Sequence, residues 1–481
     1  MRLLSPLPMA CLLLLAGCAV ARGDRTTSVA LPPARPAETI VPVSGPAQAV
    51  VIGRAVPAEW WHAFASARLD HLVADVLAHD NDLATAEATL RQAREQAKAT
   101  VGGQGPQVDA SYQAQRVRVS QAFSNPLAAD PDEYLYTLHT AQLSIAYPLD
   151  LFGGGRNKIR SARAATDVAA ARLVAARTTA VANLVLAVIQ HAALAGQVDA
   201  TRGAIDSNRQ LVALLERRRA IGDVGAADVA AQQTALATSE ASLPPLERQL
   251  EHQAALIVTL TGHAAGSAVP DLPPLSELTL PADLPLALPS DVVAHRADIE
   301  AAAAQMKGAA ADVGAAMAAR LPAIQLTGNA GGAATHFADM FAAGNPFFAL
   351  IGAVTQPIFH SAQLLHQQHA AEAALEGAKA QYRAAVLQAF LDVDDALAGL
   401  RSDSAALDAA TRADLAAGQS LAMMRRQVEL GAQGTLALLT ASSAASQASV
   451  SLIQARAARL TDTVALFQAA GTDVRTSSRR D

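Results

Sequence analysis

Three motifs in the sequence carry side chains whose types and spacing could do chemistry. His366 and His369 lie one helical turn apart and could share a metal ion, but no carboxylate or cysteine adds obvious third and fourth ligands. Asp392 and Asp395 fall on one helix face, where surface charge or polar packing explains them better than acid–base catalysis. The glycine run 153–155 precedes a helical pattern and could seat a phosphate, yet no Lys-Ser or Lys-Thr pair follows it. We therefore expect no enzyme activity, no metal site and no bound cofactor.

A cysteine near the N-terminus is predicted to undergo a covalent reaction instead. The apolar stretch from Met9 to Ala16 follows a positive charge, which is typical of a secretory signal peptide. The stretch ends in Leu15-Ala16-Gly17-Cys18, which resembles the bacterial lipobox, where cleavage precedes the cysteine and the thiol is acylated. We predict that residues 1–17 are removed and that Cys18 carries the lipid; an ordinary signal peptide with a chance cysteine is the alternative. The residue after the cysteine is Ala19 and not aspartate. By resemblance to the bacterial sorting rule for lipoproteins, this favours the outer membrane.

The composition excludes several classes of protein. The chain has 481 residues, is 51% hydrophobic and only 4% aromatic, and has a formal net charge of −6. A nucleic-acid-binding protein would need an excess of basic residues or a basic face, and this acidic balance argues against that class. No uninterrupted run of about eighteen apolar residues follows the N-terminal segment, so a membrane-spanning helix is not expected. Much of the apolar share is alanine, whose small side chain suits close helix packing better than one thick core.

The placement of proline separates helical from extended segments, because proline is excluded from helix interiors. Residues 149–243 contain no proline, and residues 358–481 contain none. In the first segment, apolar residues recur at three- and four-residue steps: Val181, Leu184, Val185, Val188 and Ile189. A helix over 156–220 would be about 100 Å long, which predicts a coiled coil or a helical tube. The Pro244-Pro245 pair predicts a kink or break near Leu243.

Four segments among the proline clusters are predicted to be β-strands. They cover residues 108–114, 141–147, 324–329 and 347–356; the first three alternate apolar and polar residues, and the fourth is more uniformly apolar. Strands of about 10 residues can cross an outer membrane when tilted, although a soluble hairpin shows the same alternation. Four strands cannot close a barrel that admits a solute, and an open edge in lipid leaves backbone groups unpaired. If these strands are in the membrane, three copies of the chain would supply twelve.

The order of helix, strand pair, long helix, turn and helix occurs twice. Pro106 and Phe152 recur as Pro322 and Phe359, and each unit ends in a helical hairpin whose turn carries two glycines, with offsets of roughly 210 residues. The sequence therefore predicts the following divisions: signal peptide 1–17, lipidated extended tether 18–57, first repeat 58–265, Pro-rich connection 266–289, second repeat 290–471 and polar tail 472–481.

Ordered motifs along almost all of the mature chain resemble the outer membrane efflux proteins, the TolC/OprM/NodT-type outer membrane factors. These motifs are Trp60-Trp61, Asp150-Leu151-Phe152-Gly153, Leu288-Pro289-Ser290, Arg296-Ala297-Asp298-Ile299, Leu321-Pro322-Ala323-Ile324, Gln356-Pro357-Ile358-Phe359 and Asp392-Val393-Asp394-Asp395-Ala396-Leu397. Ala297 is a departure, because the family usually has proline there. The resemblance implies a mainly α fold with a membrane β part. A long α-helical barrel of coiled-coil hairpins would join four strands per chain in a trimeric, 12-stranded outer membrane β-barrel.

The resemblance also implies a function. The chain would be the lipid-anchored outer membrane channel of a tripartite efflux system, passing small toxic compounds or drugs from an inner-membrane pump and a periplasmic adaptor to the exterior. A lipid-anchored periplasmic coiled-coil protein is the alternative, because it needs the helices and the lipobox but no membrane strands.

The resemblance assigns two groups of residues to the periplasmic end. The adaptor-facing hairpin tips would be formed by Gly222, Val224, Gly225, Asp228, Gly431, Gly434 and Thr435. Candidates for narrowing the aperture are Asp223, Arg425, Arg426 and Glu429. For the tip residues, the alternative is that they are ordinary caps of long helices. For each aperture candidate, the alternative is a solvated helix face.

Overall fold

The structure is a computed structural model. It describes residues 39–40, 48–120, 135–286, 293, 296–359, 361–430 and 432–473. The predicted signal peptide 1–17, the lipidation site Cys18, the motif Leu288-Pro289-Ser290, the tip residue Gly431 and most of the polar tail lie outside the described residues.

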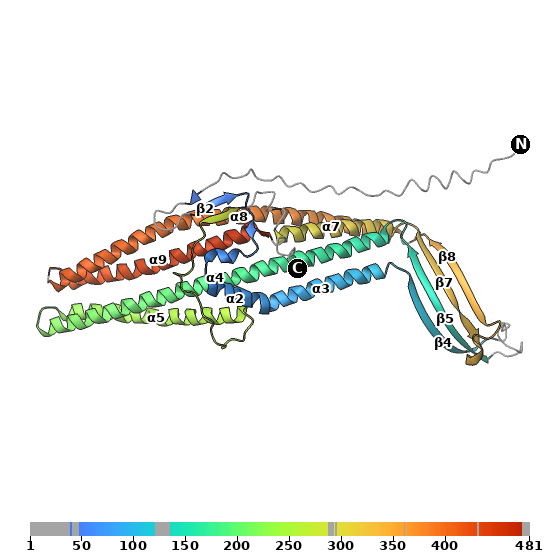
Figure 1. Cartoon of the computed structure of the whole chain (residues 1–481), viewed down its shortest axis with the longest axis horizontal. Helices are drawn as coiled ribbons and strands as arrows, with labels where there is room; N and C mark the ends of the chain where they lie inside the picture. The colour runs from blue at the N-terminus through green and yellow to red at the C-terminus, as the bar shows by residue number, and fades with distance from the viewer. Residues whose placement is uncertain are drawn as a thin grey trace, which may run out of the picture. The chain divides into compact units, whose positions relative to one another are not determined.

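Long helices make up most of the described chain (Figure 1). They are α2 (Ala67–His79), α3 (Asn81–Gly102), α4 (Gly154–Ala220), α5 (Ala226–Leu260), α7 (Ala297–Ala318), α8 (Ser361–Glu429) and α9 (Thr435–Ala470), with the short 3-10 helices η2 (Trp60–Phe64) and η3 (Phe337–Asp339). Helix α4 has 67 residues, which confirms the single long helix predicted over 156–220. At 1.5 Å per residue it is about 100 Å long.

The four predicted strands are confirmed and form one antiparallel sheet. They are β4 (Gln107–Arg118), β5 (Leu135–Leu149), β7 (Ala323–Ala334) and β8 (Pro346–Thr355), in the order β4-β5-β7-β8. The pairing of β5 with β7, from Leu149 opposite Ile324 to His139 opposite Ala334, joins the strand pairs of the two repeats. The remaining strands are short: β1 (Thr39–Ile40), β2 (Gln48–Ile52), β3 (Val56–Pro57), β6 (Asp283–Leu286) and β9 (Thr472–Asp473).

The chain forms two compact units that do not follow the two repeats. Among the described residues, a sheet unit comprises 90–169 and 302–382, and a hairpin unit comprises the rest. Each of the predicted repeats, 58–265 and 290–471, therefore contributes a strand pair to one unit and a helical hairpin to the other. The reason is that strands from both repeats hydrogen-bond to each other in one sheet.

Two predictions about local structure need correction. Of the kink or break predicted near Leu243, the break is wrong: helix α5 continues through Pro244 and Pro245 to Leu260. Both prolines are exposed, as are Glu240 and Ala241, whose carbonyl groups lose their intrahelical donors and can bond to water instead.

Part of the predicted tether 18–57 belongs to small sheets. Strand β2 pairs with β1 and with β6, which lies in the predicted Pro-rich connection 266–289. Gln48 at the start of β2 is fully buried, and its amide Nε2 donates to the Pro281 carbonyl oxygen at 3.1 Å. Strands of two to five residues that pair over more than two hundred positions leave no periodic pattern in the sequence.

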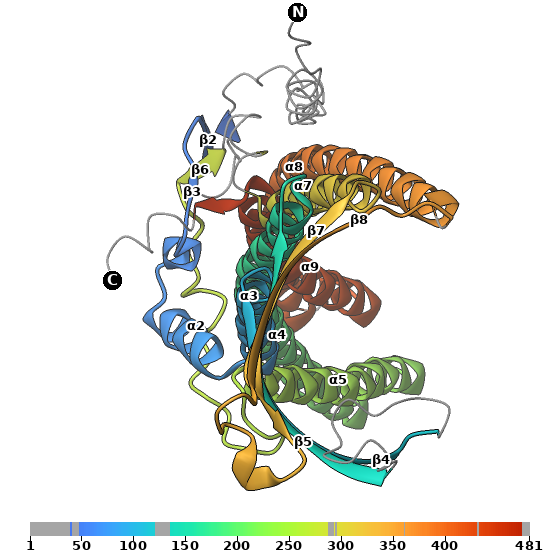
Figure 2. The same cartoon turned by 90° about the vertical axis from the view of Figure 1, so that its right-hand side faces the viewer.

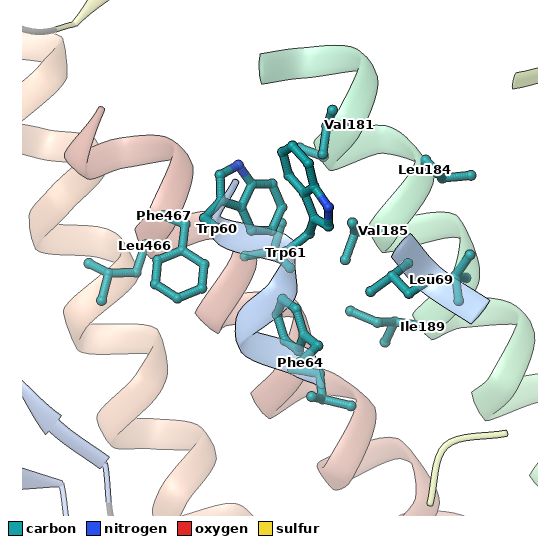
Figure 3. Packing of buried hydrophobic residues seen from close by; sticks show 14 of the residues in the cluster. Trp60, Trp61, Phe64, Leu69, Val181, Leu184, Val185, Ile189, Leu466 and Phe467 are labelled. Carbon is teal, nitrogen blue, oxygen red and sulfur yellow. The ribbon is translucent and has the colours of Figure 1, made fainter. Parts of the chain in front are cut away.

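An aromatic cluster forms the core of the hairpin unit. Trp60, Trp61 and Phe64 of η2 are buried together with Phe467 of α9, and the Trp60 and Phe467 ring centroids lie 5.5 Å apart (Figure 3). Apolar side chains of α4, including Val181, complete this cluster. By length and composition alone α4 and α9 could cross a membrane, which is weak evidence because core helices pass the same test.

The α8–α9 hairpin encloses a buried arginine beside two half-buried carboxyl groups. The Arg459 side chain is fully buried; its Nε donates to Gln48 Oε1 at 2.8 Å, and its Nη1 donates to the Leu400 carbonyl oxygen at 3.3 Å. The carboxyl of Asp403 lies beside that of Asp462. Burial, together with the neighbouring Asp462 carboxyl, raises the pKa of Asp403 to about 6.

This shift predicts a pH dependence of stability. The folded protein binds more protons than the unfolded chain between the ordinary pKa of 3.8 and the folded value of about 6, so this site makes the free energy of unfolding fall as pH rises through that window. The Asp403→Asn variant should lose this contribution and gain stability at pH 7.5, by on the order of 1 kcal/mol after allowance for solvent screening at this half-buried site. Thermal unfolding of the detergent-solubilised protein from pH 4 to 7.5 measures both. Asp395→Asn, at an exposed position of the same helix, is the control; equal pH slopes for the two variants would contradict the prediction.

Candidate functional site

The four-stranded sheet has one apolar and one polar face. Directly opposed residues of antiparallel strands project to the same side, so the register assigns each residue to a face. The apolar face carries Val108, Ala110, Tyr112, Ala114, Ala141, Leu143, Ile145, Leu326, Phe348, Leu350 and Val354. The opposite face carries Asp109, Ser111, Gln113, Thr140, Gln142, Ser144, Gln325, Thr327 and Asn329, with apolar residues of β8 among them. Figure 2 shows the sheet as a curved layer.

The apolar face of the sheet is open. Phe348 is 86% exposed, Leu350 72% and Val354 68%, so large side chains lie uncovered along one strand. Exposed apolar surface of this extent marks an interaction with lipid or protein. Alternation of an apolar and a polar face on strands of 10 to 15 residues is the pattern of membrane β-barrels.

The glycine run at the start of α4 forms a helix start closed by an aspartate, not a phosphate site. Gly153 has φ +81°, a conformation that favours glycine. The Asp150 carboxylate accepts from the backbone N–H of Arg156 at 2.8 Å, next to the first turn of the helix. Burial alone would raise the pKa of Asp150, but hydrogen bonds from the backbone N–H groups of Arg156 and Gly155 and from the Arg156 side chain lower it. A carboxylate of the chain itself thus occupies the position that an anion would take.

Among the described residues, the histidine pair gains no further metal ligands. The rings of His366 and His369 lie with centroids 6.0 Å apart and nearly perpendicular. Within the described part of the chain, no group of three or more His, Cys, Asp or Glu side chains is arranged to hold a metal ion.

Asp392 makes a structural ion pair. Its carboxylate accepts from Arg296 Nη2 at 2.8 Å, and the same guanidinium pairs with Asp298 at 2.7 Å and donates to the Ala469 carbonyl oxygen. The Arg-Ala-Asp-Ile motif thus joins the start of α7 to both helices of the second hairpin. These contacts assign Asp392 to packing, as the helix-face argument favoured.

The first hairpin tip contains the turn between α4 and α5. Gly222 has φ +76°, as expected for a tight turn, whereas Gly225 is extended and caps the start of α5. The Asp228 carboxylate accepts from the Gly225 backbone N–H at 3.2 Å, so it caps its own helix. Val224 is half-buried in this turn.

The second tip, between α8 and α9, contains a groove. Gly434 is extended and caps the start of α9; Gly431 and the Thr435 side chain lie outside the described atoms. The groove has a volume of about 680 Å³ and is lined by Ser420, Met424, Gln433, Gly434, Leu436, Ala437, Thr440, Ala441 and Ala444. Leu436 at its edge is 72% exposed, so the groove presents apolar surface at the end of the hairpin.

Arg218 holds the two tips together. Its guanidinium makes an ion pair with Asp223 and donates from Nη1 to the Val428 carbonyl oxygen of α8 at 3.2 Å. Beside this contact, Leu211, Val428 and Leu438 form a small buried cluster. Among the aperture candidates, Asp223 therefore pairs with Arg218, whereas Arg425, Arg426 and Glu429 lie in the last turns of α8. The sequence analysis did not select Arg218, although the arginine run 217–219 just before a glycine turn was the available signal.

The sequence matches the family model described as outer membrane efflux protein over residues 72–263 and 288–472. The chain belongs to this family. It is 31% identical over 341 residues to the pyoverdine export outer membrane protein OpmQ of Pseudomonas putida, covering 70% of this chain and 72% of that protein. It is 27% identical over 445 residues to the outer membrane protein OprJ of Pseudomonas aeruginosa, covering 91% of both.

Solved structures confirm the fold of this efflux protein. The outer membrane protein VceC of Vibrio cholerae superposes with a TM-score of 0.80 at 26% identity, over 86% of this chain and 98% of that one. The outer membrane channel OprN superposes with a TM-score of 0.85 at 24% identity, over 94% and 99%. The predicted helical barrel with a membrane β part, the outer membrane location and the role as an efflux channel component are thereby confirmed. The family forms channels and is not a family of enzymes.

The contact made by Arg218 predicts a change in channel opening. The Arg218→Ala variant loses the ion pair to Asp223 and the hydrogen bond to the Val428 carbonyl, so the tips should separate more often and the conductance of the purified protein in a planar bilayer should rise several-fold. Arg217→Ala is the matched control, because Arg217 Nε donates only within its own helix, to the Ala213 carbonyl oxygen. A conductance of the Arg218 variant equal to that of the control would contradict a role in holding the tips.

Proposed function

We propose that this efflux protein works as a homotrimeric channel with a twelve-stranded barrel. The sheet order places β4 and β8 at the two edges, each paired on one side only among the described strands. Unpaired backbone groups in lipid cost several kcal/mol each, so the edges need strands from other copies. Pairing β4 of one copy with β8 of the next closes the sheet, and three copies supply an even number of strands.

The cargo is proposed to be small toxic compounds or drugs. Related proteins are named for the export of pyoverdine, of toluene and of antibiotics. The polar face of the sheet, with its Gln, Ser, Thr and Asn side chains, would line a water-filled lumen through which solutes pass without energy input. An inner-membrane pump would supply the energy.

A periplasmic adaptor is the proposed partner at the hairpin tips. The groove of about 680 Å³ at the second tip, with Leu436 at its edge, offers an apolar socket for side chains of a partner helix. At the first tip, Gly222 in its positive-φ turn lets another backbone approach closely.

The N-terminus is proposed to be lipidated at Cys18, with no other cofactor. The lipid would add an outer membrane anchor to the strands. An oligomerisation and extraction experiment separates this proposal from a periplasmic protein held by its lipid alone. The Cys18→Ser variant should stay in the outer membrane until detergent is added, and should then run as a heat-modifiable trimer. Release of this variant into the soluble periplasmic fraction would contradict the membrane barrel.

The complete proposal is tested in cells that lack the gene. Deletion should lower resistance to exported drugs or aromatic compounds several-fold, and the wild-type gene should restore it. Leu436→Asp places a charge in the tip groove at an exposed position, so the protein should reach its normal level but fail to restore resistance. Leu415→Asp, on α8 outside the groove and 63% exposed, should restore resistance fully. Full activity of the Leu436 variant would rule out the groove as the adaptor socket.

A further inference from the structure

The apolar face of β4 ends in two arginines. Along this strand the residues that project to the apolar side are Val108, Ala110, Tyr112, Ala114, Arg116 and Arg118. At about 3.4 Å per residue, the two arginines lie roughly 7 and 14 Å beyond Ala114 on the same face. Both are exposed. The apolar band is therefore continued by a cationic strip at one end of the sheet.

The connections of the strands identify this end as the outer one. Gln107, Leu149 and Ala323 lie at the opposite end of the sheet, where the strands connect to α3, α4 and α7. Arg118 ends β4 at the end of the sheet that carries only the connections between strands. Because the helices of this outer membrane protein extend into the periplasm, the arginines lie at the external rim.

An aromatic cluster marks the level of the membrane interface just below the arginines. The Tyr112 hydroxyl lies 2.8 Å from His139 Nδ1, and their rings are stacked with centroids 6.2 Å apart. Phe337 of η3 packs edge-on against Tyr112 at 5.7 Å. His139 is opposite Ala114 in the register, one step before Arg116. Amphipathic aromatic residues gather where hydrocarbon gives way to headgroups, so the arginines are at headgroup depth.

The charges of the arginines are not neutralised within the sheet. Arg116 is opposite Thr137 and Arg118 is opposite Leu135, and among the described residues no carboxylate forms an ion pair with either guanidinium. The apolar face contains no acidic residue at any registered position of the four strands. A guanidinium binds phosphate through two parallel hydrogen bonds, and among the described residues neither arginine has an ion pair that would compete for these donors.

We propose that Arg116 and Arg118 bind the phosphate groups of a phosphorylated lipid headgroup in the outer leaflet. The acyl chains of this lipid would lie on the apolar face below, over Ala114 and the Tyr112 cluster, while the phosphates meet the two arginines. One lipid thus contacts a continuous surface of matched polarity and charge. The contact fixes the height of the barrel in the membrane, which is a role separate from conduction through the lumen.

Retention of a defined glycolipid by the full-length protein tests the proposal. The detergent-solubilised protein is mixed with lipid A carrying two phosphates, or with the same glycolipid after removal of its phosphates, then repurified, and bound lipid is measured by mass spectrometry. The wild-type protein should retain the phosphorylated form at least about tenfold better, and Arg116→Gln with Arg118→Gln should remove most of this preference. Arg172→Gln with Arg412→Gln removes equal charge at exposed helix positions and should leave it intact.

Several results would overturn the proposal. Equal retention of the two glycolipids by the wild-type protein excludes phosphate recognition, whether or not the arginine variants fold. Unchanged preference in a folded double glutamine variant excludes these two arginines. Complete displacement of the phosphorylated glycolipid by millimolar inorganic phosphate assigns the site to free phosphate instead of lipid. The double variant Arg116→Lys with Arg118→Lys keeps the charge but loses the paired hydrogen bonds. An intermediate preference of this variant for the phosphorylated glycolipid supports guanidinium–phosphate contact. Complete loss of the preference contradicts it.

Discussion

Backbone hydrogen bonding at the edges of the four-stranded sheet is the constraint on which the rest of this protein depends. In water, the outer N–H and C=O groups of β4 and β8 would bond to solvent, but hydrocarbon offers them no partner. The uncovered side chains of Phe348 and Leu350 favour placement of the sheet in lipid, because exposed apolar surface is more stable in hydrocarbon than in water. A sheet that is apolar on one face and unpaired at both edges forms only part of a closed barrel. Further strands must pair with its two edges to complete the barrel.

The same sheet explains why the duplicated sequence does not fold as two independent domains. Strand β5 of the first repeat pairs along eleven residues with β7 of the second, so neither strand pair exists as a separate layer. The long helices then need support of their own, since a single helix in water is stabilised mainly by the surfaces it packs against. The aromatic cluster around Trp60 and the buried Arg459 supply that support where the short strands meet the hairpins.

Stability is distributed unevenly along the hairpins. Around Trp60 many apolar side chains are fully buried, whereas the buried cluster among the described residues of the tips is small: Leu211, Val428 and Leu438, joined by the contacts of Arg218. Local opening draws on the regions with the fewest buried apolar contacts. The tips can therefore move apart at a small cost in free energy while the core and the sheet stay folded.

The amino-acid sequence by itself determined the long helices, the four membrane strands, the duplicated order and the family. These features depend on local periodicity, proline placement and ordered motifs, which can be recognised from neighbouring residues in the sequence. Examples are the helix over 156–220 and the alternation of apolar and polar residues over 108–114. Only the tertiary structure decided that α5 continues through Pro244, that β2 and β6 pair, and that Arg218 rather than Arg425 or Arg426 holds Asp223. It also decided the register that carries Arg116 and Arg118 to the apolar face. Such features arise from contacts between residues far apart in the chain and from which carbonyls water can reach, and no local pattern of residues encodes either.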